Sequence, residues 1–376
     1  MNIVKENAPH IRKKISVQRM MLDVIIALLP VVIMSLVIYQ LKALMIIGIS
    51  IVTMVLAEFV YVGLRNKMPK DGDKHSFKEK FLFAYKGHYT SVNIIAPIVS
   101  ALIFAMIMPA NATWYATLIG SLLGITLGKL VFGGLGNNIF NPAAVGMVIT
   151  KICFSSSYPA MDYSKYSFID VSAGGTPLSD LASNGLSQAL NDYSILNLLF
   201  GRIGGTLGEA CSILIIIGAI YLIIRHAADF RSMLSYLGTF LFLILISGIV
   251  IINVNPNNIN YLSFVLYELL TGGLLFGAAF MITDPVTSPI TSPGRVIYGI
   301  LAGILTVFIR FFAALPEGVA FSILIANMCA PLIDQVKWSS QKYTVKKLVV
   351  MACMLVISAA ILVIVLIFKK DGFWYE

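Results

Sequence analysis

Eleven long apolar runs, separated mostly by short polar segments, constrain this chain more than any other feature of its sequence. A helix needs about 20 apolar residues to cross the hydrocarbon layer of a bilayer, and only a helix satisfies its own backbone hydrogen bonds there. The runs lie at residues 20–40, 43–62, 93–109, 113–130, 141–156, 196–224, 233–253, 262–282, 296–313, 319–334 and 348–368. The sequence therefore predicts an all-α polytopic integral membrane protein, a bundle of 10 or 11 transmembrane helices. The third, fifth and tenth runs are short enough to be tilted or broken.

Charge is too scarce for a soluble fold. Charged residues make up 12% of the chain, about half the quarter found in globular proteins. This excludes a soluble enzyme, a disordered linker and a nucleic-acid-binding protein. Four cysteines stand singly in apolar runs. Their spacing indicates neither a disulfide framework nor a metal site, so we expect packing residues and no metal.

The basic residues indicate the orientation. With the N-terminus inside, the inner segments hold 20 of the 27 Lys and Arg residues, Lys129 among them. The long loop 157–195 holds Lys165 and four aspartates. The positive-inside rule then predicts a multi-pass protein of the bacterial plasma membrane, with a cytoplasmic N-terminus. The net charge of +9 thus belongs to cytoplasmic loops rather than to a nucleic-acid patch.

This topology divides the chain into five parts. Two membrane halves of about five helices each, 20–156 and 196–334, flank the exoplasmic loop 157–195. A cytoplasmic segment, 1–19, precedes them. Residues 335–376 form a cytoplasmic linker and an extra C-terminal helix that either spans the membrane or contacts another protein of a complex.

Two segments on the predicted cytoplasmic side interrupt the helical pattern in a similar way. Residues 132–144 read FGGLGNNIFNPAA, and residues 276–289 read FGAAFMITDPVTSP. Each places Asx-Pro shortly after Phe-Gly, and proline both removes a donor and restricts the residue before it. Broken helices of this kind often mark the central site of a transporter. Two ordinary tight turns would show the same spacing.

Acidic residues inside apolar runs need a partner, because a carboxylate facing lipid is costly. For Asp23 and Glu58, each near a helix end, we expect a hydrogen bond to a neighbouring helix or a neighbouring chain. For Glu209 and Glu268 such a bond and contact with a transported ion are both open. Glycines beside Glu209, at residues 204–208, either allow close helix packing or admit a ligand.

Three segments together resemble the RnfD/NqrB family of membrane subunits of redox-driven ion pumps. They are FGGLGNNIFNPAAVG, DVSAGGTPL, and the block from TDPVTSP through GRVIYGILAGILTVFIR to PEGVAFSILIANMCAPLID. In that family a threonine of the outer loop carries FMN through a phosphoester. Asp170 and Thr176 keep the family spacing, whereas Ala173 and Gly175 depart from its usual residues. Taken alone, a threonine after two glycines is also compatible with a turn.

The resemblance implies Thr176 as the site of covalent FMN. Residues that would support this loop are Asp170, Ser172, Gly174 and Gly175. It also implies a second flavin, riboflavin, held without a covalent bond near the cytoplasmic breaks. Candidates for that contact are Asn137, Asn138, Asn141 and Asp284, while Glu209 and Glu268 are candidates for an ion pathway.

The resulting hypothesis is the RnfD-type membrane component of an Rnf ferredoxin:NAD⁺ oxidoreductase, which relays electrons across the membrane, coupled to Na⁺ or H⁺ transport. Partners would be flavin- and iron–sulfur-bearing subunits, a flavin transferase and membrane lipid, and no nucleic acid. An NqrB-type component of a Na⁺-translocating NADH:quinone oxidoreductase is the alternative within the family. It usually has a longer N-terminal region. A secondary transporter or channel, or a passive scaffold, is the alternative of another class.

Overall fold

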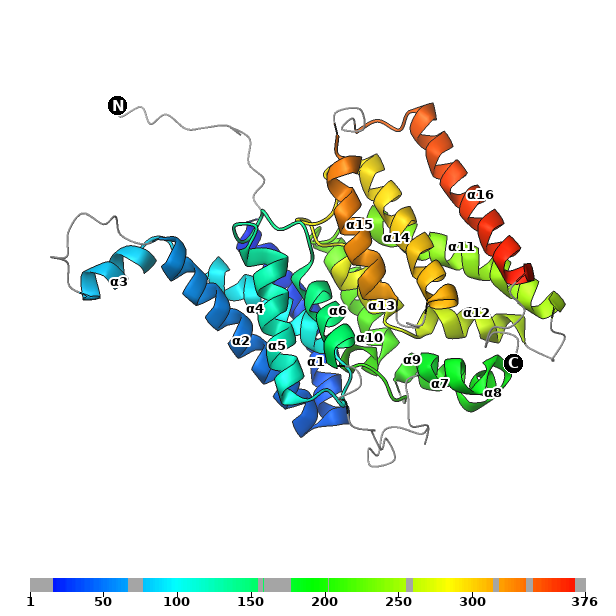
Figure 1. The fold of residues 1–376 in the computed structure, drawn as a ribbon, viewed down its shortest axis with the longest axis horizontal. Coiled ribbons are helices and arrows are strands. Elements are labelled where there is room, and N and C mark those ends of the chain that lie inside the picture. Colours follow the sequence, from blue (N-terminus) through cyan, green and yellow to red (C-terminus); the bar gives the residue numbers. More distant parts are fainter. Residues whose placement is uncertain are drawn as a thin grey trace.

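The structure, a computed structural model, describes residues 16–66, 77–154, 158, 177–201, 203–254, 260–313, 318–335 and 341–368. Within these ranges the regular elements are helices (Figure 1). The α-helices are α1 Val17–Tyr39, α2 Leu41–Arg65, α3 Phe77–Tyr85, α4 Val92–Ile107, α5 Trp114–Ile125, α6 Pro142–Phe154, α7 Pro177–Asn184, α8 Leu186–Asp192, α9 Ile195–Phe200, α10 Ser212–Ile224, α11 Phe230–Val254, α12 Tyr261–Leu270, α13 Leu274–Phe276, α14 Ser292–Phe312, α15 Val319–Ile333 and α16 Val345–Phe368. Two π-helices, η1 Thr126–Leu130 and η5 Gly277–Met281, and the 3₁₀-helix η4 Leu207–Ala210 complete the described elements.

The helices account for the predicted spans. Among the described residues, α1, α2, α11, α14 and α16 are each long and apolar enough to cross a membrane. The bent pair of α12 with α13 and η5 is a sixth candidate, with a bend of 53°. Shorter apolar helices, α4, α6, α10 and α15, fill further predicted runs, and α5 continues directly into η1. The all-α multi-pass fold is confirmed, and the predicted C-terminal run forms α16.

The breaks in the spans are not all where the sequence indicates them. The three short runs form the unbroken helices α4, α6 and α15. The expectation of one span at 196–224 was wrong, because α9 ends at Gly201 and α10 begins only at Ser212. Gly201 adopts a left-handed conformation with φ of 74°, which glycine alone adopts without strain. The chain between then forms η4 and packs against the end of α4, where Leu207 N–H donates to Met108 O at 3.1 Å.

Loops that were predicted on one side of the membrane do gather at one end of the bundle. Arg65 Nη1 donates to Gly133 O at 2.7 Å, which joins the end of α2 to the first break. Arg231 Nη1 donates to Ser292 Oγ at 2.7 Å, and Asp334 Oδ2 accepts from Ile290 N–H at 3.0 Å. We call this end, with residues 131–141 and 282–291, the break end. In Figure 1 it lies toward the top, and α7, α8 and α9 lie at the opposite end.

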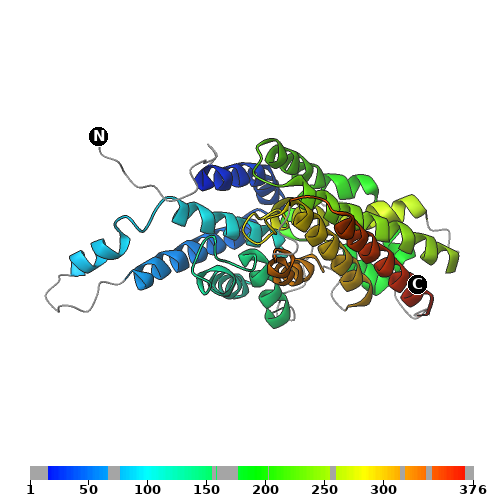
Figure 2. The same ribbon diagram turned by 90° about the horizontal axis from the view of Figure 1, so that it is seen from above.

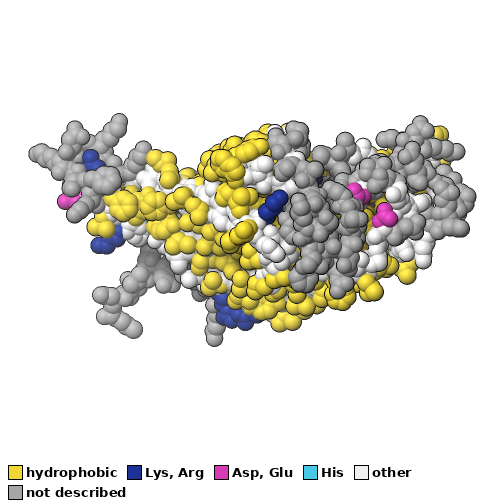
Figure 3. Space-filling model, turned by 90° about the horizontal axis from the view of Figure 1, so that it is seen from below, with side chains coloured by type: hydrophobic (Ala, Val, Ile, Leu, Met, Phe, Trp, Pro, Cys, Tyr) yellow, Lys and Arg dark blue, Asp and Glu magenta, His cyan; other side chains and the backbone are white. Residues whose placement is uncertain are grey.

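The bundle is elongated when it is seen along the other axis (Figure 2). Helices α1 to α6 gather on one side and α11 to α16 on the other, with α6 against α15 near the middle. Hydrophobic side chains dominate much of the described surface in Figure 3, as lipid contact requires. Exposed apolar residues such as Leu44, Val52 and Ile220 lie on this outer surface. Charged side chains inside the bundle occur as ion pairs, described below.

Candidate functional site

The two predicted breaks meet at one cavity. Each begins directly after a π-helix, η1 before residues 131–141 and η5 before residues 282–291. A π-turn inserts one residue into an α-helix and is frequent at functional sites. The irregular backbone that follows is buried in protein, as membrane depth requires. The interpretation of the breaks as parts of one site is therefore the better of the two that the sequence left open.

Asn141 and Asp284 shape the two breaks by the same local chemistry. Asn141 Oδ1 accepts from the Ala143 N–H at 3.0 Å and caps α6. Asp284 Oδ1 accepts from the Val286 N–H at 3.1 Å. Such side-chain bonds to the backbone two residues on are the reason that Asx residues favour turns. Both residues thus hold the loop backbone that forms the wall of the cavity.

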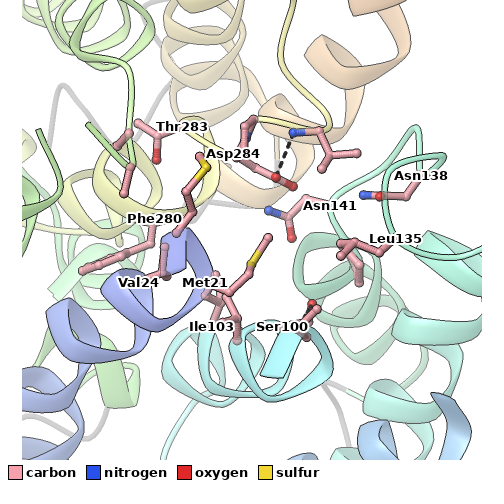
Figure 4. A pocket seen from close by; sticks show the side chains of 18 of the residues that line it. Met21, Val24, Ser100, Ile103, Leu135, Asn138, Asn141, Phe280, Thr283 and Asp284 are labelled. Atoms are coloured by element: carbon pink, nitrogen blue, oxygen red, sulfur yellow. Dashed lines mark hydrogen bonds between the residues drawn. The ribbon is translucent and has the colours of Figure 1, made fainter. Parts of the chain in front are cut away.

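The cavity, here called the break cavity, encloses about 730 Å³ of empty space, part of it open to the surface. Its walls come from α1, α4, η1, η5 and both breaks. Asn138, Asn141 and Asp284 lie on one side, facing Met21, Val24 and Ile103 (Figure 4). Three of the four predicted flavin contacts are therefore brought together. Asn137 is not among the lining residues; its side chain is exposed and lies beside Gly133.

Asn138 gives this cavity the chemistry of a ligand site. Its side chain is 6% exposed, and its Oδ1 has no hydrogen-bond partner among the described residues. Its Nδ2 is already used, since it donates to Phe140 O at 3.2 Å. Leaving a buried carbonyl oxygen unsatisfied costs about 1–3 kcal/mol. Apolar walls with a few converging polar groups are typical of cofactor pockets, and a flat heteroaromatic ring with a polar edge fits this arrangement.

Lys129 is a lining residue that the sequence analysis placed wrongly among the cytoplasmic loop charges. It belongs to η1 and is 1% exposed. Its Nζ lies 2.9 Å from Glu58 Oε2 on α2. Its position inside the apolar run 113–130 was the signal that could have shown its burial, because a lysine there needs an internal partner.

The expected helix-to-helix contacts of Glu58 and Asp23 are confirmed. Glu58 is paired with Lys129, and both side chains are almost fully buried. Asp23 Oδ1 accepts from Tyr221 Oη at 3.0 Å and from Arg225 Nε at 3.2 Å, both contributed by the region of α10. These acids therefore join α1 and α2 to their neighbours.

Glu209 lines a second, smaller cavity of about 390 Å³ near the middle of the bundle. Its Oε2 accepts from the Thr206 N–H at 3.2 Å and completes a capping box at η4. Gly273 and Phe276 of the bent α12–α13 pair lie across this cavity. Phe276 also contacts Phe280 of the break cavity, with ring centroids 5.0 Å apart. Glu209 is thus a buried carboxylate on a cavity, as an ion-pathway residue requires.

Glu268 has a different environment from Glu209. Its Oε2 lies 3.0 Å from Arg310 Nη1, and both side chains are buried. Arg310 also donates to Glu268 O at 2.7 Å and to Thr271 O at 2.8 Å, and it lies over the ring of Phe240. This network satisfies the backbone carbonyls that the break after α12 exposes. The geometry therefore explains Glu268 as part of a structural ion pair.

The predicted flavin-bearing loop lies outside the described residues, including Asp170, Ser172, Gly174, Gly175 and Thr176. The described chain resumes at Pro177, directly after Thr176. Tyr267 Oη donates to Pro177 O at 2.5 Å, and Leu178 is 1% exposed. The start of α7 is therefore fixed against α12.

Asp180 completes this attachment of α7. Its carboxylate accepts a hydrogen bond from Tyr193 at the end of α8. Burial raises the pKa of Asp180, while the bond from Tyr193 opposes that shift. The segment from α7 to α8 is thus held by polar contacts as well as by apolar packing.

Comparison with known proteins gives a consistent result. A family model described as the NQR2, RnfD, RnfE family matches residues 4–342. The NqrB-type component of a Na⁺-translocating NADH-quinone reductase from Chromohalobacter salexigens is 35% identical, over 67% of this chain and 60% of that protein. The RnfD-type component of a proton-translocating ferredoxin:NAD⁺ oxidoreductase complex from Clostridium ljungdahlii is 29% identical, over 88% and 92% respectively. Its counterpart in the Na⁺-translocating complex from Acetobacterium woodii is 30% identical, over 89% and 93%.

Proposed function

The chain belongs to the NQR2, RnfD, RnfE family, whose matched relatives are subunits of ion-translocating oxidoreductase complexes, and from this we propose that it is the RnfD-type component of a ferredoxin:NAD⁺ oxidoreductase. Its alignments with the two ferredoxin-type relatives run along more than nine tenths of those proteins. The alignment with the quinone-reductase component from Chromohalobacter salexigens covers 60% of that protein. The extent of the alignments favours the ferredoxin type over the quinone-reducing type.

The break cavity is the observation that carries a redox role for this chain. A flavin, when bound, supplies one- and two-electron chemistry, and the protein supplies position, electrostatics and exclusion of water. Asn138, Asn141 and Asp284 would hold the polar edge of a riboflavin. Val24 and Phe280 would cover its apolar part and keep water away. A plain transporter or channel gives no reason for an unsatisfied Asn138 oxygen above an apolar floor.

Thr176 would carry a second flavin, FMN, by a phosphoester bond. The proposal is supported by the match to the family and by the fixed position of the adjacent Pro177. A flavin transferase would attach this group, and flavin- and iron–sulfur-bearing subunits would exchange electrons with it. The loop would face the outside of the cell membrane, and the N-terminus would be cytoplasmic.

Ion transport would be coupled to reduction through charge. Added negative charge in a low-dielectric interior attracts a cation strongly, because Coulomb energy scales inversely with the dielectric constant. Glu209 lies on the cavity next to the break cavity and is the carboxylate best placed to receive Na⁺ or H⁺.

Intact mass of the purified full chain tests the covalent attachment. The chain produced with its flavin transferase should gain the mass of one FMN less water, on the peptide that contains Thr176. Thr176→Ala should lose that increment and its in-gel fluorescence, whereas the matched control Ser172→Ala should keep both. Retained fluorescence in Thr176→Ala would contradict the assignment.

Activity of the native complex tests its type. Membranes that contain the complex should reduce NAD⁺ with reduced ferredoxin, and deletion of this chain should abolish that activity. If the complex instead oxidises NADH with a quinone and ignores ferredoxin, the quinone-reducing type replaces the proposed one.

A further inference from the structure

A polar cleft lies beside the break cavity. It is formed at the break end between the end of α2, the start of α4 and the first break, and it encloses about 800 Å³. Its lining includes Glu58, Arg65, His88 and Asn93, and the side chain of His88 is exposed. Leu135 lines both the cleft and the break cavity, so that the two spaces share one wall.

The ion pair of Glu58 and Lys129 crosses this wall. Glu58 lines the cleft, and Lys129 lines the break cavity. Lys129 Nζ and Glu58 Oε2 are 2.9 Å apart, and the two side chains are 2% and 3% exposed. A carboxylate and an ammonium in direct contact thus connect a polar, water-accessible space to a closed apolar one.

Stability alone is a poor reason for this pair. A buried ion pair often contributes less than apolar residues of similar volume would, because removing two charges from water is costly. An acid and a base at hydrogen-bond distance, in contrast, are able to exchange a proton. Lysine is suited to this because burial readily shifts its pKa, unlike that of arginine.

We propose that Glu58 and Lys129 are a proton relay that carries protons from the polar cleft to a reducible ring in the break cavity. This inference rests on the proposed function in one respect, namely that a flavin occupies this cavity. Lys129 and Glu58 are positioning and proton-transfer residues of that site, and they add a water connection that the break cavity otherwise lacks.

Electrons and protons reach the ring by separate routes. An electron donor, a reduced flavin or iron–sulfur centre of another protein in the complex, delivers two electrons to the ring. Lys129 Nζ gives up one proton to the ring and becomes neutral. Glu58, protonated from water in the cleft, returns one proton to Lys129, and the ion pair is restored. The net transfer is two electrons from the donor and one proton from the cleft.

Other titratable groups surround the pair. Asp284 faces Lys129 from the second break, across the break cavity. Tyr61, Arg65 and His88 line the cleft with Glu58. Burial raises the pKa of Tyr89 and the negative charge of Glu58 adds to that shift, so that Tyr89 remains a neutral phenol near neutral pH. His88 is the group of this set that ordinarily titrates near neutral pH.

Lys129→Arg separates a relay from a structural ion pair. Arginine keeps the positive charge and a partner for Glu58, but it is not deprotonated in proteins. The matched control is Lys42→Arg, an exposed lysine on α2. The double variant Lys129→Met/Glu58→Gln removes the pair without leaving a buried charge, and it serves as the second test where the arginine variant folds poorly.

The experiment uses the full chain in a Thr176→Ala background, so that the break cavity holds the remaining flavin. Reduced methyl viologen delivers electrons and no protons. Stopped-flow absorbance then follows flavin reduction, and a pH-indicator dye follows proton uptake. Lys129→Arg and the double variant should retain the flavin and slow proton uptake by about 100-fold, in the range of a positioned acid–base group. Lys42→Arg should behave like the parent.

The outcomes are distinguishable. Proton uptake at the parental rate in both pair variants, with flavin bound, would overturn the relay alone. A parental chain that carries no non-covalent flavin would overturn the proposed occupant of the break cavity and the relay with it. Slow uptake in both pair variants and normal uptake in Lys42→Arg would support the relay.

Discussion

Asn141 and Asp284 make the same turn at two distant points of the chain, and both turns border one cavity. Each accepts, through Oδ1, the backbone N–H two residues on, at 3.0 Å and 3.1 Å, and each is followed by proline. The amide and the carboxylate serve equally as acceptors, so the negative charge of Asp284 is not needed for its turn. The charge is therefore available for a second role toward the cavity.

Asp284→Asn should separate the turn from the charge. The asparagine keeps an acceptor for the Val286 N–H, so thermal stability should stay close to that of the parent. Loss of a negative charge beside the cavity should make a bound flavin easier to reduce, which spectroelectrochemical titration measures. Asp284→Ala, the control, loses the turn as well and should be less stable by about 1 kcal/mol. Equal destabilisation by asparagine and alanine would show that the charge itself holds the loop.

Gly272→Ala should be markedly destabilising. Gly272 has φ of 69°, and an added Cβ would collide with Leu178 and lie 2.6 Å from Arg310 Nη2. We expect a loss of about 1–3 kcal/mol, as for overpacked core positions, measured by thermal unfolding in detergent. Gly48→Ala is the control, since its Cβ would meet nothing within 4 Å. It should be neutral or gain up to about 1 kcal/mol from helix propensity.

The membrane-spanning helices could be predicted because the bilayer imposes one requirement on every segment, a long apolar run. The two breaks could be predicted because proline and glycine act on the local backbone. The gap between α9 and α10 was missed, since its apolar residues satisfy the length criterion although Gly201 ends the helix. The π-helices η1 and η5 have no local signal of their own, because the inserted residue depends on packing around it.

The candidate site was predicted in part for the same reasons. Asn138, Asn141 and Asp284 stand in similar sequence contexts, and the structure brings them to one cavity. Lys129 was missed as a site residue, because a charge count assigns a residue to a side of the membrane but not to a partner. The pairing of Lys129 with Glu58 depends on how η1 faces α2, and a single sequence does not encode that rotation in any local pattern.

Arg310→Met should destabilise the chain because it leaves the buried Glu268 carboxylate without its partner. We expect a loss of about 3–5 kcal/mol, seen in thermal unfolding of the purified chain. Arg310→Met/Glu268→Gln should recover part of that loss, since no charge remains uncompensated. If Glu268 belongs to the ion pathway, the double variant will fold and still fail to support ion transport in the native complex. Normal transport would identify the pair as structural.

The stability of the α7–α8 segment should depend on pH through Asp180. Because burial raises the pKa of this carboxyl group in the folded chain, the folded state binds more protons than the unfolded state. The contribution of Asp180 is therefore most favourable below its ordinary pKa and is lost as the pH rises through the raised value. Asp180→Asn should remove this dependence, measured by proteolysis within α7–α8 at mildly acidic and neutral pH. Identical pH profiles in the two proteins would contradict the assignment.

Glu209→Gln tests the remaining ion-pathway candidate with little change in structure. Glutamine keeps an oxygen that accepts the Thr206 N–H, so the capping box at η4 should persist. It removes the negative charge from the cavity that Gly273 and Phe276 line. We expect normal assembly of the complex, retained flavin and a strongly reduced rate of Na⁺ or H⁺ transport per electron transferred. Glu209→Ala should differ by also losing the cap, at a cost of about 1 kcal/mol. Unchanged ion transport in a well-folded glutamine variant would exclude Glu209 from the pathway, because a neutral amide does not exchange protons and binds cations weakly.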